Sequence, residues 1–257
     1  VTNNDSSYFA PIASKKLPEH ITKLVNKEKK TGCCVHISKL DKIRIKTPRA
    51  FSKRNKTVSA FATELSRIFR HFLDNDDSYG KKRNIVIHTL DLDGNNIIDP
   101  YKLTPNDPMF LLEPNYFVEI PPITSENDYK YLQDAQKLKD KATNYLYGED
   151  KVINVRTHDH KDHTYTIRKS IADPNIQTIG GRSQALAIYE KNTGISFVRA
   201  QREIQLGFFN HIAQSEARNR WWGIEVRFEP GLDEYFGVTH DKQTVKNASK
   251  MVTYNAR

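Results

Sequence analysis

The sequence predicts an α+β fold in which helices pack on one face of a mixed sheet. Some segments alternate hydrophobic and polar residues, which is typical of strands, whereas others repeat hydrophobic residues every three or four positions, which is typical of helices. The order along the chain is strand, helix, hairpin, helix, hairpin, helix, strands and helix. Such an order is the pattern of an α+β domain.

The composition agrees with a packed domain that has a charged surface. The chain has 257 residues, of which 37% are hydrophobic and 28% charged, and its net charge is +9. This length allows one large domain or two small ones. A basic balance favours anionic partners such as nucleotide, nucleic acid or acidic proteins, but the scattered lysines do not select among them.

The two cysteines, Cys33 and Cys34, are adjacent, so the sequence contains no disulfide framework. We therefore expect a reducing, cytoplasmic setting, or a nuclear one if the protein is eukaryotic. No stretch has the length and hydrophobicity of a membrane span, and no signal peptide is recognisable. We expect no membrane partner.

The first half of the chain predicts a strand, a helix and a hairpin. Residues 1–30 are polar and lysine-rich, and we interpret them as a linker. Residues 32–41 fit a half-buried strand. A hairpin is expected at 83–99, because Asp93-Gly94 is a strong turn signal and 97–98 would begin the return strand. Residues 59–73 predict a helix, because hydrophobic residues recur there at helical spacing: Phe61, Leu65, Ile68, Phe69 and Phe72.

The middle of the chain predicts helices on both sides of a strand pair. Residues 101–122 are interrupted by prolines and predict a loop or an edge strand. Residues 125–146 predict a mostly polar helix with a thin hydrophobic stripe. Residues 152–171 predict two strands joined by a charged turn. A short helix is expected at 183–192, with Gly194 as its C-cap.

The last part of the chain predicts further strands and a final helix. Residues 195–209 predict a strand pair or one long strand. Residues 221–228 predict a strand with alternate hydrophobic residues on one face. Residues 232–239 predict a loop, and Val245 is expected to begin a helix.

A histidine-rich turn is the first candidate site. His158, His160, Asp162 and His163 follow the pattern HxHxDH, which resembles the zinc motif of the metallo-β-lactamase superfamily. Three imidazoles and a carboxylate can bind zinc and activate a water molecule. That family continues into a helix, whereas residues 164–167 read as another strand. The alternative is therefore a polar hairpin turn.

Two glycine-containing loops offer weaker motifs. Residues 91–95 hint at a calcium loop, but Gly94 is at the fourth position rather than the sixth that an EF-hand requires. Gly180 and Gly181 lack the glycine spacing that binds phosphates. We interpret both segments as turns.

The second candidate site is a lysine on a polar loop. The hydrophobic strand at 221–228 is followed by a loop in which Lys242 precedes Gln243. A lysine there can meet a phosphate as a flexible point charge. In a dry site it can stabilise the charge that develops during phosphoryl transfer. The alternative is an ordinary surface loop.

Three segments resemble GHKL ATPases of the MORC type. Residues 239–243 (THDKQ) look like the phosphate-contacting lysine loop, which has counterparts on the second domain of gyrase B, type IIB topoisomerases and MutL. Residues 194–204 are similar to the family pattern GIxxxRxxRxI. Residues 31–41 are similar to GTxVxWxxLD, although His36 stands where the family has an aromatic residue. The resemblance covers residues 31–246.

The resemblance implies a transducer domain with a ribosomal-protein-S5-like fold at residues 31–246. Residues 1–30 would be a linker or the tail of an upstream ATP-binding domain, and residues 247–257 a C-terminal tail or the start of a helix. Lys242 would contact the γ-phosphate of ATP, which is bound with Mg2+ on the upstream domain, and Gln243 would assist on the same loop. Nucleotide binding would then be relayed to dimerisation or to partner binding.

The motifs with which this family binds nucleotide are missing from the sequence. There is no helix with a catalytic acid and an asparagine, no DxGxG loop and no glycine-rich lid, and residues 1–30 are too short to supply them. The chain begins at Val1 rather than Met, so we expect a fragment or a processed product. Because the resemblance is to an ATPase and these motifs are missing, we expect it to be part of an ATPase, inactive by itself and without a tightly bound cofactor. Two alternatives stay open: a basic nucleic-acid-binding or interaction module without catalysis, and a zinc hydrolase.

Overall fold

The computed structural model describes residues 49–51, 56–58, 60–74, 83–91, 93, 95–96, 99–112, 144–177 and 189–248. The chain divides into two compact units, Val1–Arg44 with His88–Pro100 and Ile45–Ile87 with Tyr101–Arg257. The strand predicted at 32–41 and the linker at 1–30 lie outside the described residues.

The larger unit contains both strands and helices, so the predicted α+β class is confirmed. Its strands are β1 (Arg49–Phe51), β2 (Lys56–Val58), β3 (Val86–Ile87), β4 (Tyr101–Lys102), β5 (Asn144–Leu146), β6 (Lys151–Arg156), β7 (Asp162–Ala172), β8 (Gly194–Arg199), β9 (Arg202–Gly207) and β10 (Trp222–Phe228). Its helical elements are α2 (Ala60–Ile68), α3 (Arg70–Leu73), α5 (Pro174–Gln177), η1 (Ala217–Trp221), η2 (Pro230–Leu232) and α7 (Asp233–Phe236).

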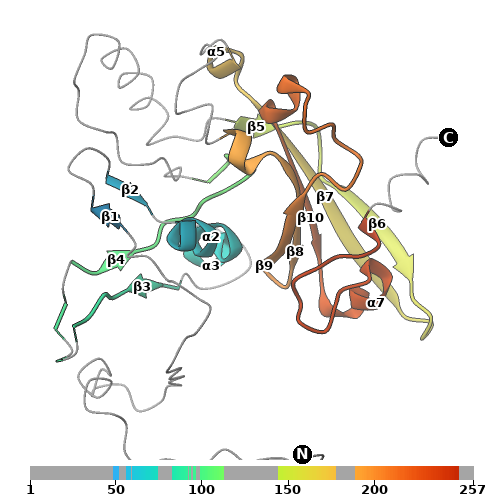
Figure 1. The fold of residues 1–257 in the computed structure, drawn as a ribbon. Coiled ribbons are helices and arrows are strands. Elements are labelled where there is room, and N and C mark those ends of the chain that lie inside the picture. The colour runs from blue at the N-terminus through green and yellow to red at the C-terminus, as the bar shows by residue number, and fades with distance from the viewer. Residues whose placement is uncertain are drawn as a thin grey trace, which may run out of the picture. The chain divides into compact units, whose positions relative to one another are not determined.

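A mixed six-stranded sheet forms the centre of this unit (Figure 1). The strand order is β5-β7-β10-β8-β9, and β6 also pairs with β7. Strand β10 is antiparallel to β7 and parallel to β8, whereas the other pairs in the sheet are antiparallel. The two-stranded pairs β1-β2 and β3-β4 lie outside this sheet. The prediction of a mixed sheet is therefore confirmed.

One face of the sheet is hydrophobic. Val226 and Phe228 of β10 lie opposite Ile167 and Tyr165 of β7, and all four belong to or pack against the main core. Helix α7 covers this face with Phe236, which is fully buried. Its ring stacks on the ring of Phe228 at a centroid distance of 4.1 Å. Burial of these side chains ties the short helix to the sheet, because removing apolar area from water is the main stabilising contribution.

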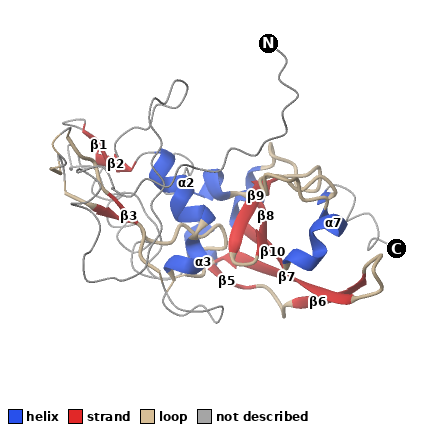
Figure 2. Ribbon diagram, turned by 90° about the horizontal axis from the view of Figure 1, so that it is seen from below, coloured by secondary structure: helices blue, strands red, loops and turns tan. Residues whose placement is uncertain are grey.

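The opposite face is polar and is covered by other helices. Alternation along β10 directs Glu225 away from the side occupied by Val226. Arg70 of α3 binds Glu225 on the face opposite to Val226. The prediction that helices pack on one face is therefore wrong: α2 and α3 lie on one side of the sheet and α7 on the other (Figure 2). The sheet has buried residues on both faces, so each face needs its own cover.

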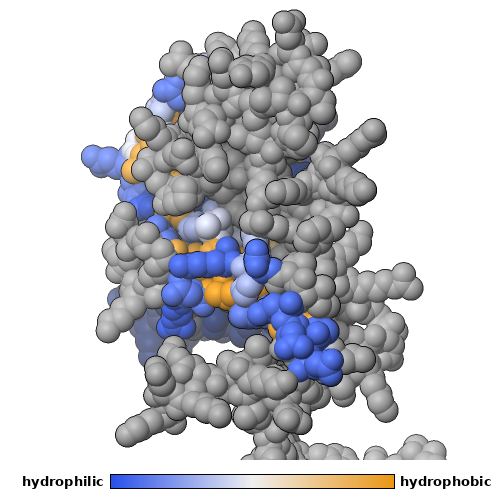
Figure 3. Space-filling model, turned by 90° about the vertical axis from the view of Figure 1, so that its left-hand side faces the viewer, coloured by the Kyte–Doolittle hydropathy of each residue, from blue (hydrophilic) through white to orange (hydrophobic). Residues whose placement is uncertain are grey.

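The helix predicted at 59–73 is present but divided. Helices α2 and α3 are separated at Phe69, whose φ of −106° and ψ of 17° interrupt the regular geometry. Ala62 packs in a second small core together with Leu65, Leu73, Leu103, Ile85, Ile87 and Tyr101. Figure 3 views the molecule from the left-hand side of Figure 1, where hydrophobic residues (orange) are visible between hydrophilic ones (blue).

The hairpin predicted at 83–99 forms with a later return strand. Strand β3 pairs antiparallel with β4, so the return strand is at Tyr101–Lys102 rather than at 97–98, which lie outside the described residues. Within the smaller unit, a bridge between Leu90 and Asn96 closes a turn around Asp93. The backbone of Asn95 donates a hydrogen bond to the Asp91 carboxylate at 2.8 Å. Asp91, Asp93 and Asn95 thus belong to a turn.

The helix predicted at 125–146 is wrong at its end, because Asn144–Leu146 form strand β5, paired with β7. The remainder of that segment up to residue 143 lies outside the described residues. Asn144 donates to Ser170, so an interstrand contact decides the local structure.

Gly194 begins strand β8 instead of capping a helix. The helix predicted at 183–192 is observed at its end, over 189–192. Gly194 has a φ of +143°, and an added Cβ would lie 3.0 Å from the carbonyl oxygen of Gly207. Glycine is required there by the close approach of β9 as well as by the backbone angle.

Residues 232–239, predicted as a loop, contain the end of η2 and the whole of α7. Gly237 ends α7 in the left-handed conformation, with a φ of +63°. The helix expected from Val245 is also wrong at its first residue, because Val245 forms an antiparallel bridge with Val238.

Other sequence predictions are confirmed. Residues 152–171 form the antiparallel pair β6 and β7, and residues 195–209 form the pair β8 and β9. The strand at 221–228 is β10. Within the described part of the chain, no helix combines the length and hydrophobicity needed to cross a membrane.

Candidate functional site at the ends of the parallel strands

The loop that carries Lys242 is a closed turn. Val238 and Val245 form a bridge at its base, and the Thr239 amide donates to the Thr244 carbonyl at 3.1 Å. At the tip, the Lys242 amide donates to the Thr239 carbonyl at 2.9 Å. These bonds fix the backbone on both sides of Lys242.

Asp241 stabilises the tip from within. Its carboxylate accepts hydrogen bonds from the Thr239 hydroxyl and from the Gln243 amide. Lys242 has a φ of +56°, which lies in the left-handed region. A residue with a Cβ adopts this backbone conformation at a cost of about 1 kcal/mol. The turn therefore determines the direction of the lysine against its local preference.

The amine of Lys242 binds a carboxylate at the edge of the sheet. Its Nζ lies 2.9 Å from Oδ2 of Asp233, and its side chain is 40% exposed. Arg199 holds the same carboxylate with both Nε, at 2.6 Å, and Nη2, at 2.9 Å. We call Arg199, Asp233 and Lys242 the Asp233 cluster. It contains two cations and one anion, and so it carries a net positive charge.

Opposing effects set the pKa of Asp233. Partial burial by itself would raise it, but hydrogen bonds from Arg199 and Lys242 outweigh that effect and hold the pKa below its usual value. Asp233 is therefore ionised at neutral pH, and its charge is shared between two cations.

Topology brings the cluster together. Arg199 is the last residue of β8, and Asp233 follows shortly after β10 ends at Phe228. Since β8 and β10 are parallel, their carboxyl ends meet at the same edge of the sheet. In α/β proteins this edge is where ligands commonly bind.

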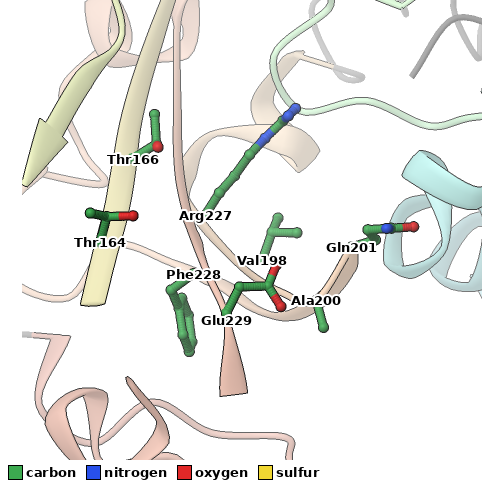
Figure 4. Close-up of a pocket in the computed structure, with 8 residues that line it drawn as sticks. All are labelled: Thr164, Thr166, Val198, Ala200, Gln201, Arg227, Phe228 and Glu229. Atoms are coloured by element: carbon green, nitrogen blue, oxygen red, sulfur yellow. The ribbon is translucent and has the colours of Figure 1, made fainter. Parts of the chain in front are cut away.

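A polar pocket of about 190 Å³ lies at the same edge on the other face of the sheet. In Figure 4, Thr164 and Thr166 extend from β7 on one side and Gln201 lies on the other. The remaining lining residues are Val198, Ala200, Arg227, Phe228 and Glu229. Successive residues of a strand point to opposite faces. Val198 therefore lines the pocket on one face of the sheet, and Arg199 belongs to the Asp233 cluster on the other face.

The turn between β8 and β9 is strained at this edge. Ala200 and Gln201 connect the strands with φ values of +45° and +70°. Two-residue hairpin turns with two positive φ values favour asparagine, aspartate and glycine, none of which is present. The Ala200 amide donates to the carbonyl of Phe228 at 3.0 Å, which ties the turn to the end of β10.

Gln243, the predicted partner of Lys242, follows it in the sequence but is bound to Asp241, whereas Lys242 is bound to Asp233. Gln243 is exposed, and its described hydrogen bond runs from its backbone to Asp241. The sequence analysis assigned no role to Asp233 or Arg199, although Arg199 is the first arginine of the pattern GIxxxRxxRxI at 194–204. The bidentate match of an arginine with an aspartate 34 positions later has no local signature.

The histidine-rich segment spans the turn between β6 and β7 and the first two residues of β7, Asp162 and His163. His158, His160 and Asp162 are exposed, and His163 is half-buried. His163 packs against Gly231, where an added Cβ would clash with its ring. No group of three or more His, Cys, Asp or Glu side chains suited to a metal occurs among the residues that the structure describes. The zinc hypothesis stays a prediction from the sequence pattern.

A second charged cluster is buried under α2 and α3. Arg70 is fully buried and contacts Glu203 at 2.6 Å, Glu225 at 2.5 Å and the Ser196 hydroxyl at 2.7 Å. Asp107 lies 3.5 Å from its Nε. We call the set centred on this guanidinium the Arg70 cluster.

Neighbouring side chains complete the Arg70 cluster. Arg67 binds the free oxygen of Glu203 at 2.6 Å. His71 lies 2.9 Å from Glu225, and because a carboxylate only accepts, the imidazole Nε2 is the donor. Arg227 binds the other oxygen of Glu225. Three arginines thus face three carboxylates, which lets the charges remain buried.

Burial and charge oppose each other in the Arg70 cluster. Burial alone would raise the pKa of Glu225, but the charges of Arg70 and His71 hold it well below its usual value. Burial would likewise lower the pKa of Arg70, and the charges of Glu225 and Glu203 raise it instead. Sequence reasoning missed this cluster. A signal was present, because Ala62, Ser66 and Arg70 recur every four residues along the buried stripe.

Comparison with known proteins adds no identification: no family model, no curated protein and no solved structure matches this chain.

Proposed function

We propose that this chain is the transducer portion of a GHKL ATPase of the MORC type, with a ribosomal-protein-S5-like fold. In this proposal Lys242 contacts the terminal phosphate of ATP bound with Mg2+ on a separate ATP-binding domain. Gln243, on the same loop, assists this phosphate contact. Nucleotide binding is then relayed to dimerisation or to partner binding.

The position of the Lys242 amine carries the proposal. It stands on a closed turn at the carboxyl ends of two parallel strands, its side chain is 40% exposed, and its cluster has a net positive charge. A partly exposed cation on a fixed backbone is what a phosphate from outside the chain requires, because the protein needs little reorganisation to meet it. The resemblance of residues 239–243 to the phosphate-contacting loop agrees with this arrangement.

The test compares two lysines in the protein together with its ATP-binding domain. We expect Lys242→Ala to lower ATP turnover on the order of 10²-fold while ATP affinity changes little, since one charge that stabilises the transition state is removed. Lys246→Ala is the matched control, because Lys246 is exposed on the following turn. Turnover is measured by phosphate release and affinity by equilibrium binding.

Two results contradict the proposal. The first is ATP hydrolysis by this chain alone at the rate of a complete GHKL ATPase. The second is unchanged turnover in the Lys242→Ala protein.

A further inference from the structure

We infer that Asp233 is the counter-ion of Lys242 in the nucleotide-free protein and that the terminal phosphate takes its place when ATP is presented. Asp233 is thus a positioning residue that sets how readily the lysine accepts an anion. The inference rests on the proposed function and adds the control of that lysine.

The contacts of Asp233 differ for its two cations. Arg199 binds it through a planar fork, with both oxygens engaged, at 2.6 and 2.9 Å. Lys242 approaches one oxygen at 2.9 Å with a single flexible amine. A bidentate guanidinium pair is the stronger and more directional of the two. When an anion competes, the lysine is therefore the cation that leaves.

The loop allows the amine to move while the backbone stays in place. The bridge between Val238 and Val245 and the contacts of Asp241 fix the turn without using the Lys242 side chain. Rotation of that side chain alone transfers the amine from Asp233 to a phosphate. Arg199 then leaves Asp233 as a neutral pair, so no uncompensated carboxylate remains.

Removing the carboxylate charge tests this exchange directly. In Asp233→Asn, Lys242 loses its competing anion, and we expect the affinity of the chain for inorganic tripolyphosphate to rise about tenfold at low salt. The gain disappears in the double variant Asp233→Asn with Lys242→Ala. Isothermal titration calorimetry measures both affinities on the chain described above.

Asp241→Asn provides the matched control. It changes the net charge by the same amount on the loop that carries Lys242, whereas Asp233 lies in α7. Its amide oxygen still accepts from Thr239 and Gln243. Asp241 is placed at the tip, where it contacts those two groups rather than the lysine amine. An equal gain in both variants means that net charge alone is responsible, and it overturns the inference. So does the absence of a gain in Asp233→Asn.

A second measurement covers the case in which Asp233→Asn does not fold. In the unmodified chain, the ammonium resonance of Lys242, assigned by its loss in Lys242→Arg, is expected to shift when tripolyphosphate is added. An unshifted resonance at saturation overturns the inference. The two proposals can fail separately. If Asp233→Asn binds tripolyphosphate more tightly but Lys242→Ala keeps normal ATP turnover, the counter-ion role stands and the proposed function is wrong. If Lys242→Ala loses turnover but Asp233→Asn shows no gain in affinity, the proposed function stands and the counter-ion role is wrong.

Discussion

The sheet carries two charged clusters with the same types of residue and opposite environments. In the Arg70 cluster the side chains of Arg70, Glu203 and Glu225 are at most 1% exposed. In the Asp233 cluster the side chains of Arg199, Asp233 and Lys242 are between 21% and 40% exposed. Both clusters join a helical element to the sheet through arginine and a carboxylate.

The comparison indicates that burial decides which cluster is structural and which can exchange partners. A charge without water depends on its protein partners, so a buried pair cannot open without a large penalty. When an exposed pair opens, water stabilises its separated charges nearly as well as the pair did, so the pair contributes little to folding. The ion pairs of the Asp233 cluster can therefore open at little cost, whereas the Arg70 cluster fixes α3 on the sheet.

The largest expected effect comes from removing the buried cation. Arg70→Met keeps much of the side-chain volume but leaves Glu203 and Glu225 buried without their shared partner. We expect the free energy of unfolding to fall by about 3–5 kcal/mol, measured by urea denaturation. Arg168→Met is the control, because Arg168 binds Asp150 with both side chains about 30% exposed.

For Arg168→Met we expect a loss of less than about 1 kcal/mol. Similar losses in both variants would show that burial does not separate the two kinds of pair in this protein, and would break the comparison.

The next effect is a loss of stability in acid. The pKa of Glu225 and that of Glu203 lie below the ordinary value of 4.5 in the folded chain, because the arginine charges outweigh the effect of burial. The unfolded chain therefore binds more protons than the folded chain in this range. The stabilisation is complete above pH 4.5 and is lost as pH falls through the folded pKa values.

Urea denaturation between pH 7 and pH 3 measures this dependence. Glu225→Gln is expected to flatten it, because one of the titrating carboxylates is gone. Stability that stayed constant down to pH 3 would mean that the buried carboxylates do not titrate with folding.

The smallest effect is expected at the exposed cluster. Lys242→Ala removes a partly exposed ion pair and should change the free energy of unfolding by less than about 0.5 kcal/mol. The Thr239 and Asp241 contacts that maintain the turn are retained. A thermal unfolding midpoint close to that of the unmodified chain would sharpen the comparison. A loss of several degrees would assign Lys242 a structural role.

Local patterns accounted for several strands of the main sheet and for the first helix. The alternation in 152–171 and 221–228 predicted β6, β7 and β10, because a half-buried strand repeats every two residues. The helical spacing from Phe61 to Phe72 predicted α2 and α3, apart from the break at Phe69. Asn144–Leu146 were assigned to a helix, since the pairing with β7 that makes them a strand involves residues far along the chain.

The candidate site was only partly predictable. Lys242 was identified from its loop and from a family resemblance. Its contact with Asp233 depends on α7, which the sequence presented as a loop. Four residues with one buried aromatic, Phe236, are too short for a helical period to be recognised, and the packing against Phe228 stabilises them instead.

By itself, the sequence determined the α+β class, the alternating strands and the polar loop with its lysine, because these follow from short-range periodicity. Only the tertiary structure decided which face each helix covers, that Arg70 is buried between two glutamates, and that Asp233 links Arg199 to Lys242. The physical reason is that burial and ion pairing arise between residues up to 155 positions apart. No local pattern encodes such separations.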